Sequence, residues 1–130
     1  MKLQRQTLFG GKEGNCFAAC VASLLGLDLS DVPNFCARQT WWVDLIDWVR
    51  PFGLRPLSFP TRGRTDEWAT WFAPDQVVIA SGPAVRGFDH STLYLDGKLF
   101  WDPHPSGDGI LLVNDVIFFM AVEPHRVVAR

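Results

Sequence analysis

The sequence has no long apolar run, no excess of basic charge and few cysteines. No apolar segment approaches the roughly 18 residues of a membrane-spanning helix. Residues 1–14 lack the apolar core of a signal peptide. The formal net charge is −2, whereas nucleic-acid-binding surfaces normally carry a basic excess. We therefore expect a cytoplasmic protein that binds neither a membrane nor nucleic acid.

The cysteines, Cys16, Cys20 and Cys36, are odd in number. A disulfide framework needs an even set, so we expect three free thiols. A zinc site built from Cys16, Cys20 and the histidines is possible in composition. However, the spacing of Cys16 and Cys20 lacks the tight two-residue loop of a zinc knuckle. We expect no metal and no cofactor, with Cys20 in the core and Cys36 structural.

The length of 130 residues and the hydrophobic content of 48% predict one domain, residues 1–130, with a single core. Segment 16–26 is apolar nearly all round, as in a buried helix, with Asn15 as its N-cap and Gly26 as its end. Segment 38–53 shows tryptophans at helical spacing and ends at Pro51 and Gly53.

Strands dominate the second half of the sequence. Asp96-Gly97 between two strand-like runs is a strong hairpin signal. The pattern predicts a short strand over 54–59, a helix over 65–73 with Thr65 as its N-cap, strands over 76–82, 90–95 and 98–102, and one or two strands within 110–124. Helices followed by antiparallel strands predict an α+β fold, with N-terminal helices packed on a C-terminal sheet.

Cys16 opens the first predicted helix. The unpaired N–H groups and the positive dipole end at that position lower a thiol's pKa and favour the nucleophilic thiolate. Gly14 lets the backbone approach a substrate closely. The backbone N–H of Cys16 is a candidate donor to a developing oxyanion. The alternative is that Cys16 is only a small buried hydrophobe.

A nucleophilic cysteine needs a base, and hairpin geometry selects His90. If residues 96 and 97 form the turn, His90 lies opposite position 103, within one residue of Asp102. An acid beside the histidine orients the ring and stabilises the imidazolium. Asp102 before Pro103 also fits a simple turn. His104 fits either a surface loop or the lining of the cleft, and of these two interpretations we favour the surface loop. We expect His125 to be solvated. Trp101 is a candidate cover for the His90–Asp102 pair.

Three stretches, "GNCFAACVASLLGL", "DVPNF" and "DHSTLYLDGKLFWDPHPSGDG", resemble the papain-like cysteine peptidase superfamily, with small bacterial and phage members the most similar. The resemblance runs from about Gln6 to about Val122. It implies a papain-like fold with Cys16 as nucleophile, His90 as base and Asp102 as orienting acid. It also implies a glutamine ahead of the cysteine as a second oxyanion donor. Gln6 is the candidate, although its interval to Cys16 is longer than usual.

The leading hypothesis is a thiol hydrolase or acyl transferase that cleaves an amide or isopeptide bond through a thioester intermediate. The expected partner is a peptide or an isopeptide-linked protein, with specificity from loops such as "FPTRGRTDEW" and "SGPAVRGFD". The alternative is a binding module on a papain-like scaffold that lacks turnover.

Overall fold

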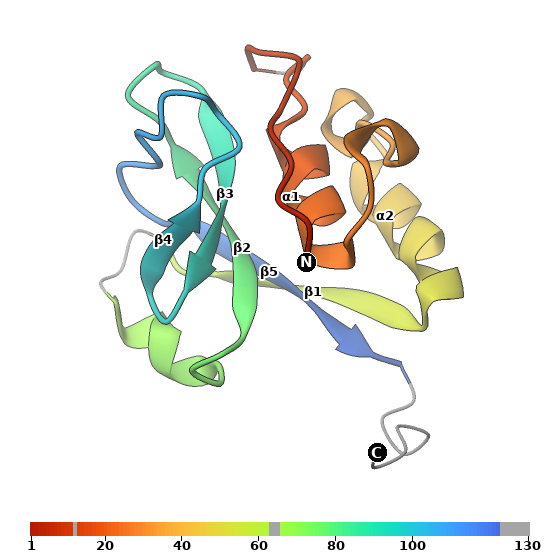
Figure 1. Cartoon of the computed structure of the whole chain (residues 1–130). Helices are drawn as coiled ribbons and strands as arrows, with labels where there is room; N and C mark the ends of the chain where they lie inside the picture. The colour runs from red at the N-terminus through yellow and green to blue at the C-terminus, as the bar shows by residue number, and fades with distance from the viewer. Residues whose placement is uncertain (12, 63–65, 123–130) are drawn as a thin grey trace.

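The chain folds into helices followed by an antiparallel sheet, as Figure 1 shows for the computed structural model. The structure describes residues 1–11, 13–62 and 66–122. Within these ranges there are two α-helices, four short 3-10 helices and five strands. The α-helices are α1 (Cys16–Leu25) and α2 (Trp41–Val49); the 3-10 helices span Leu29–Asp31, Phe35–Ala37, Arg50–Phe52 and Asp66–Trp71. The strands are β1 (Leu54–Pro60), β2 (Val77–Pro83), β3 (Asp89–Leu95), β4 (Lys98–Trp101) and β5 (Asp115–Ala121). The predicted α+β class is confirmed.

The sheet has the strand order β1-β5-β2-β3-β4. All neighbouring strands are antiparallel. The segment 110–124, predicted to hold one or two strands, supplies β5 alone among its described residues. β5 lies between β1 and β2, so the last strand among the described residues joins β1 to the rest of the sheet.

Alternation along the strands gives the sheet two buried faces. Ile79 of β2 and Leu93 of β3 belong to the cluster formed with α1 and α2. Their neighbours Val78 and Ala80 belong to a second cluster, which contains Trp68 of the 3-10 helix Asp66–Trp71. Successive side chains of a strand point to opposite faces, so both faces are covered. The predicted helix over 65–73 is thus a shorter 3-10 helix, and its predicted cap, Thr65, lies outside the described residues.

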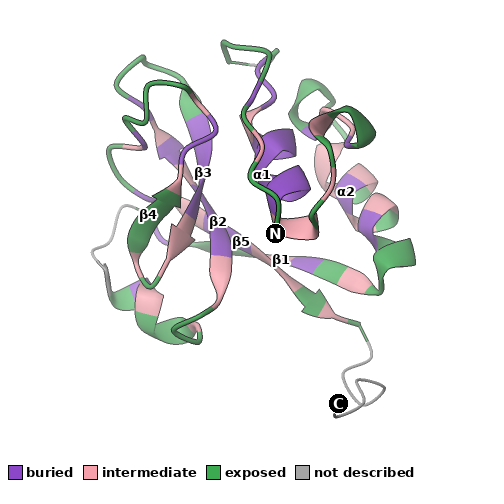
Figure 2. Cartoon of the chain, in the orientation of Figure 1, coloured by how far each residue is buried: buried purple, intermediate pink, exposed green. Residues whose placement is uncertain are grey.

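Helix α1 packs against β3 and β2, and Figure 2 shows that it is buried along most of its length. The end predicted at Gly26 is confirmed: this residue has φ 71°, and its N–H reaches the carbonyls of Ala22 and Ser23. A left-handed residue is the common way to satisfy the last carbonyls of a helix. No helix among the described residues combines the length and the apolar character needed to span a membrane.

Helix α2 is shorter than the predicted 38–53. It begins at Trp41, and from Arg50 the chain continues as a 3-10 turn to Gly53, which has φ 74°. Pro51 cannot donate a helical hydrogen bond and its ring crowds the preceding turn, so the α-helix ends before it. The buried residues Leu45 and Val49 face the core, and α2 packs on β1.

The β3–β4 hairpin has the predicted turn. Asp96 and Gly97 both have positive φ, 54° and 78°, as a two-residue hairpin turn requires. Leu95 pairs with Lys98 as the turn position predicts, but a bulge between Leu93 and Tyr94 then shifts the register by one residue. The far ends of the two strands still meet, which brings His90 to Asp102.

Candidate active site

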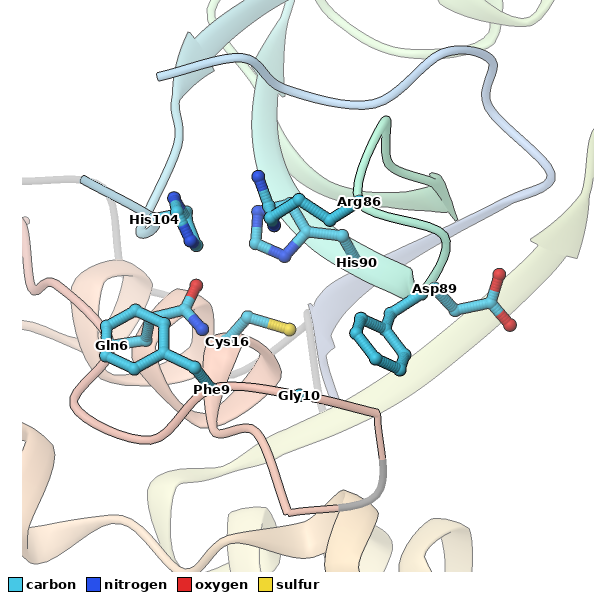
Figure 3. A pocket seen from close by; sticks show the side chains of 9 residues that line it. Gln6, Phe9, Gly10, Cys16, Arg86, Asp89, His90 and His104 are labelled. Atoms are coloured by element: carbon cyan, nitrogen blue, oxygen red, sulfur yellow. The ribbon is translucent and has the colours of Figure 1, made fainter. Parts of the chain in front are cut away.

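The structure brings Cys16, His90 and Asp102 together from three elements. Cys16 is the first residue of α1, His90 lies on β3, and Asp102 directly follows β4. The Nε2 atom of His90 lies 2.7 Å from Oδ1 of Asp102, and both residues are buried. The His90 ring also interacts with the Cys16 side chain, and this interaction lowers the pKa of Cys16. Because Nε2 is engaged by Asp102, Nδ1 is the nitrogen available to the sulfur, and Figure 3 shows the sulfur below this ring.

The carboxylate of Asp102 is fixed by donors on both oxygens. Oδ1 accepts from the backbone N–H of His104 at 2.9 Å, in addition to the His90 contact. Oδ2 accepts from the N–H of Gly109 at 2.8 Å. Asp102 therefore has both of the roles that its sequence context suggested. It organises the turn that follows, and it orients the His90 ring.

The Cys16 sulfur lies in surroundings that favour the thiolate. Burial raises the pKa of Cys16, but the hydrogen bond and the charge of His90 lower it, as do hydrogen bonds from Ser91. The Ser91 backbone N–H donates to the sulfur at 3.4 Å. The net effect is a pKa below the ordinary value for Cys16. Ser91 was not predicted as a site residue; its only sequence signal is its position after His90 on a strand.

The pKa values of the two partners move in the matching directions. Burial lowers the pKa of His90, but the hydrogen bonds to Asp102 and Cys16 outweigh it and raise the pKa to about 9. Burial raises the pKa of Asp102, whereas the hydrogen bonds from His90, His104 and Gly109 lower it by more. At neutral pH these shifts favour a thiolate, an imidazolium and a carboxylate in a row.

Asn15 stands at the N-cap position of α1 but does not cap the helix with its side chain. The position of the predicted cap is therefore right, but the expected hydrogen bond from the helix to the Asn15 side chain is not formed. Instead, Oδ1 of Asn15 accepts from the N–H groups of Thr7 and Leu8, both at 2.9 Å, and Nδ2 donates to Oγ1 of Thr7 at 2.9 Å. Because Thr7 and Leu8 engage the side-chain amide of Asn15, that amide does not accept a hydrogen bond from the first-turn N–H groups of α1 near Cys16.

We call residues 4–8 the N-terminal strap. The strap is fastened to α1 by Asn15 and to the β4 side by two further hydrogen bonds. The N–H of Gln6 donates to the Pro103 carbonyl at 3.1 Å, and the Trp101 indole N–H donates to the Gln4 carbonyl at 3.0 Å. Trp101 thus fastens the strap through its polar edge, a contact that the sequence did not predict.

Gln6 is buried within the strap and lines a cavity together with Cys16. Its Nε2 donates to the Leu8 carbonyl at 3.0 Å, while its Oε1 has no hydrogen-bond partner among the described residues. Figure 3 shows the amide nitrogen on the side that faces Cys16. The long interval between the two residues is accommodated by a loop in which Gly10 has φ 104°.

Gly14 is required by this loop. A Cβ at Gly14 would lie 2.4 Å from the carbonyl oxygen of Gly10, far inside van der Waals contact. The expected reason for this glycine was a close approach to substrate. The structure adds a second reason, because Gly14 admits the backbone of Gly10 and so allows the strap to return to the helix start. The close approach to substrate stays a prediction, and Gly14 lines a cavity beside Cys16.

Two cavities adjoin Cys16, and His90 lines both. The first cavity, of about 150 Å³, is lined by Gln6, Phe9, Arg86 and His104 among others. The preference for His104 as a surface loop residue is therefore wrong: its ring faces His90 with centroids 6.1 Å apart, at the cavity wall. The sequence signal for this position, which we missed, is that His104 closely follows Asp102 in the chain. His125 lies outside the described residues.

The second cavity has a volume of about 250 Å³ and lies on the side of Phe17, Trp41 and Cys36. Cys36 is exposed, while Cys20 is fully buried as predicted, and burial raises the pKa of Cys20 well above its ordinary value. Within the described ranges, no group of three or more His, Cys, Asp or Glu side chains is arranged to hold a metal ion.

Comparison of the chain with family models, with curated proteins and with solved structures finds no match. The function proposed below therefore depends on the geometry of the site.

Proposed function

We propose that the protein is a thiol hydrolase or acyl transferase that cleaves an amide or isopeptide bond, with Cys16 as nucleophile, His90 as base and Asp102 as orienting acid. The observation that carries this proposal is the row in which the Cys16 sulfur lies beside the His90 ring and the Nε2 atom of that ring is hydrogen-bonded to the buried Asp102 carboxylate. Nucleophile, base and orienting group within hydrogen-bond reach are the signature of covalent catalysis.

In the first step the Cys16 thiolate attacks the carbonyl carbon of the amide, and a C–S bond forms as the carbonyl π electrons move to oxygen. The proton on Nδ1 of the His90 imidazolium passes to the leaving nitrogen. The C–N bond then breaks, which releases an amine and leaves a thioester on Cys16. Asp102 keeps the His90 ring oriented while the ring changes from imidazolium to neutral imidazole.

In the second step neutral His90 takes a proton from water or from an acceptor amine. The activated nucleophile attacks the thioester carbonyl, the C–S bond breaks, and the sulfur departs as thiolate beside the reformed imidazolium. Water gives a carboxylic acid, and an amine gives a new amide. Hydrolysis and acyl transfer therefore use the same three side chains.

The proposed mechanism assigns two donors to the oxyanion of each step. The backbone N–H of Cys16 belongs to the first turn of α1, where N–H groups have no intrahelical acceptor. The amide nitrogen of Gln6 carries two hydrogens, and the Leu8 carbonyl takes one of them. The other remains for a substrate oxygen in the cavity that Gln6 shares with Cys16.

We also propose that the fold is papain-like. We propose further that the protein is a cytoplasmic thiol protease that acts on peptides or on isopeptide-linked proteins. The order of the elements supports the fold: a cysteine at a helix start, then a histidine on a strand, then an acid after the next strand. The position of Gln6 ahead of Cys16 and in the same cavity adds to this support.

Acylation by p-nitrophenyl acetate tests this function without knowledge of the substrate. We expect a burst of one equivalent of nitrophenol and a single acetyl thioester on Cys16, seen by mass spectrometry after an acid quench. The burst should persist in Cys36→Ser and vanish in Cys16→Ala. Equal, slow acetylation of Cys16 and Cys36 would contradict the proposal and favour a binding module without turnover.

A further inference from the structure

The second cavity beside Cys16 differs from the first in the charge of its walls. Arg86 and His104 line the first cavity and do not line the second. Asp115 lines the second cavity and not the first, whereas Asp89 lies at the wall of both. Apart from the Cys16 thiolate and His90, these carboxylates are its only charged side chains among the described residues.

The two carboxylates come from different strands. Asp89 opens β3, directly before His90, and Asp115 opens β5. Asp115 is partly buried, whereas Asp89 is exposed. Within the described part of the chain, neither carboxylate makes a side-chain hydrogen bond or an ion pair. Burial and the charge of Asp89 raise the pKa of Asp115, which is the direction expected for a carboxylate that lacks a cationic partner.

The remaining walls suit the apolar stem of a long side chain. Phe17 and Trp41 pack edge to face with ring centroids 5.6 Å apart and line the same cavity. An apolar stem can lie along these rings while its charged end reaches a carboxylate. An aromatic face also attracts a cation.

We propose that the second cavity is a specificity site that takes a lysine or arginine side chain of the substrate, with Asp115 as its main carboxylate and Asp89 at its rim. The proposal rests on the proposed function, because it is the Cys16 nucleophile at the same cavity that gives the bound side chain a role. Binding of a cation there supplies the partner that Asp115 lacks, and the substrate is then held with its amide bond near the sulfur.

Labelling of Cys16 by a matched pair of electrophilic peptides tests the preference at the level of substrate. The two peptidyl chloromethyl ketones differ only in lysine or Nε-acetyl-lysine next to the electrophile, and Cys36→Ser serves as the background. We expect the lysine peptide to label Cys16 at least about tenfold faster. Asp115→Asn should remove most of this ratio, and Asp89→Asn part of it. Asp47→Asn, the same charge change on the exposed side of α2, should leave it unchanged.

A second measurement does not depend on the nucleophilicity of Cys16. In Cys16→Ser, the exposed Cys36 reports on the same cavity through its rates with a cationic and an anionic methanethiosulfonate, each normalised to free 2-mercaptoethanol. We expect the cation to be favoured several-fold, and Asp115→Asn to abolish this preference while Asp47→Asn keeps it.

The two measurements separate failure of the cavity from failure of the enzyme. Equal peptide rates at a Cys16 that reacts rapidly with iodoacetamide would overturn the specificity site and leave the proposed function standing. A cation preference at Cys36 beside an inert Cys16 would support the site and contradict the proposed function. Equal effects of Asp115→Asn and Asp47→Asn would also overturn the site, because the preference would then come from net charge.

Discussion

Replacing His90 with alanine should move the pH range in which Cys16 reacts to higher pH. In the folded protein, burial alone would raise the pKa of Cys16, and the hydrogen bond and charge of His90 reverse that effect. Without the ring the burial remains and only the Ser91 hydrogen bonds oppose it, so the pKa of Cys16 should rise. A thiol with a pKa of 9.0 is only about 1% thiolate at pH 7, so a rise in the pKa of Cys16 removes thiolate from the variant.

We therefore expect the rate of iodoacetamide alkylation at pH 7 to fall by at least about tenfold, which corresponds to about 1.4 kcal/mol. A thiolate of higher pKa is intrinsically more nucleophilic, which offsets part of the loss. The midpoint of the full pH profile is for that reason the decisive quantity. His104→Ala is the matched control, since it removes an imidazole from the same cavity wall, and His90→Gln provides a second variant at the site. A midpoint unchanged in both His90 variants would refute the ion pair.

Three further predictions concern the groups around this pair. The basic limb of acylation by an amide substrate should lie near pH 9, where the His90 imidazolium that protonates the leaving nitrogen loses its proton; Asp102→Asn should move this limb to lower pH, because the hydrogen bond to the carboxylate raises the pKa of the ring, and a pH–rate profile of single-turnover acylation shows whether it does. Asn15→Ala should lower the free energy of unfolding by about 1–3 kcal/mol, since two N–H groups of the strap lose their acceptor. Asn15→Asp keeps that acceptor, so urea titration should show that this variant retains most of the stability. Gly14→Ala should destabilise the protein by about 1–3 kcal/mol through overpacking, whereas Gly11→Ala, which would meet only the Phe88 ring at 3.2 Å, should cost less in the same titration; equal losses would argue against the close approach of the loop.

Local patterns predicted the parts of the site that depend on one element or one turn. The start of α1 at Cys16 follows from an apolar segment after a polar pair, and the His90–Asp102 contact follows from a two-residue hairpin turn. Both hold because helix and hairpin geometry are set by neighbours in the sequence. The bulge between Leu93 and Tyr94 shifted the register by one residue, yet the long side chains still meet.

The features that the sequence did not predict all depend on distant contacts. The place of β5 between β1 and β2 is decided by which strand edges remain open, and alternation within the strand does not encode it. Asn15 has the residue type of a helix cap, but the returning strap offers its amide two N–H groups and a hydroxyl at once. Asp115 belongs to the segment 110–124, which the sequence predicts to hold one or two strands, and only the packing of α1 against the sheet places it in a cavity with Cys16.

The ionisation state of Cys16 at neutral pH tests the central claim most directly. The thiolate absorbs in the ultraviolet where the thiol does not, so the difference spectrum between the wild type and Cys16→Ser reports this one sulfur. Burial raises the pKa of Cys20 well above its ordinary value, and the pKa of Cys36 is raised to about 12, so both thiols contribute little at pH 7. We predict a thiolate signal at pH 7 that disappears in His90→Ala. A wild-type difference spectrum without thiolate up to pH 8 would contradict the account.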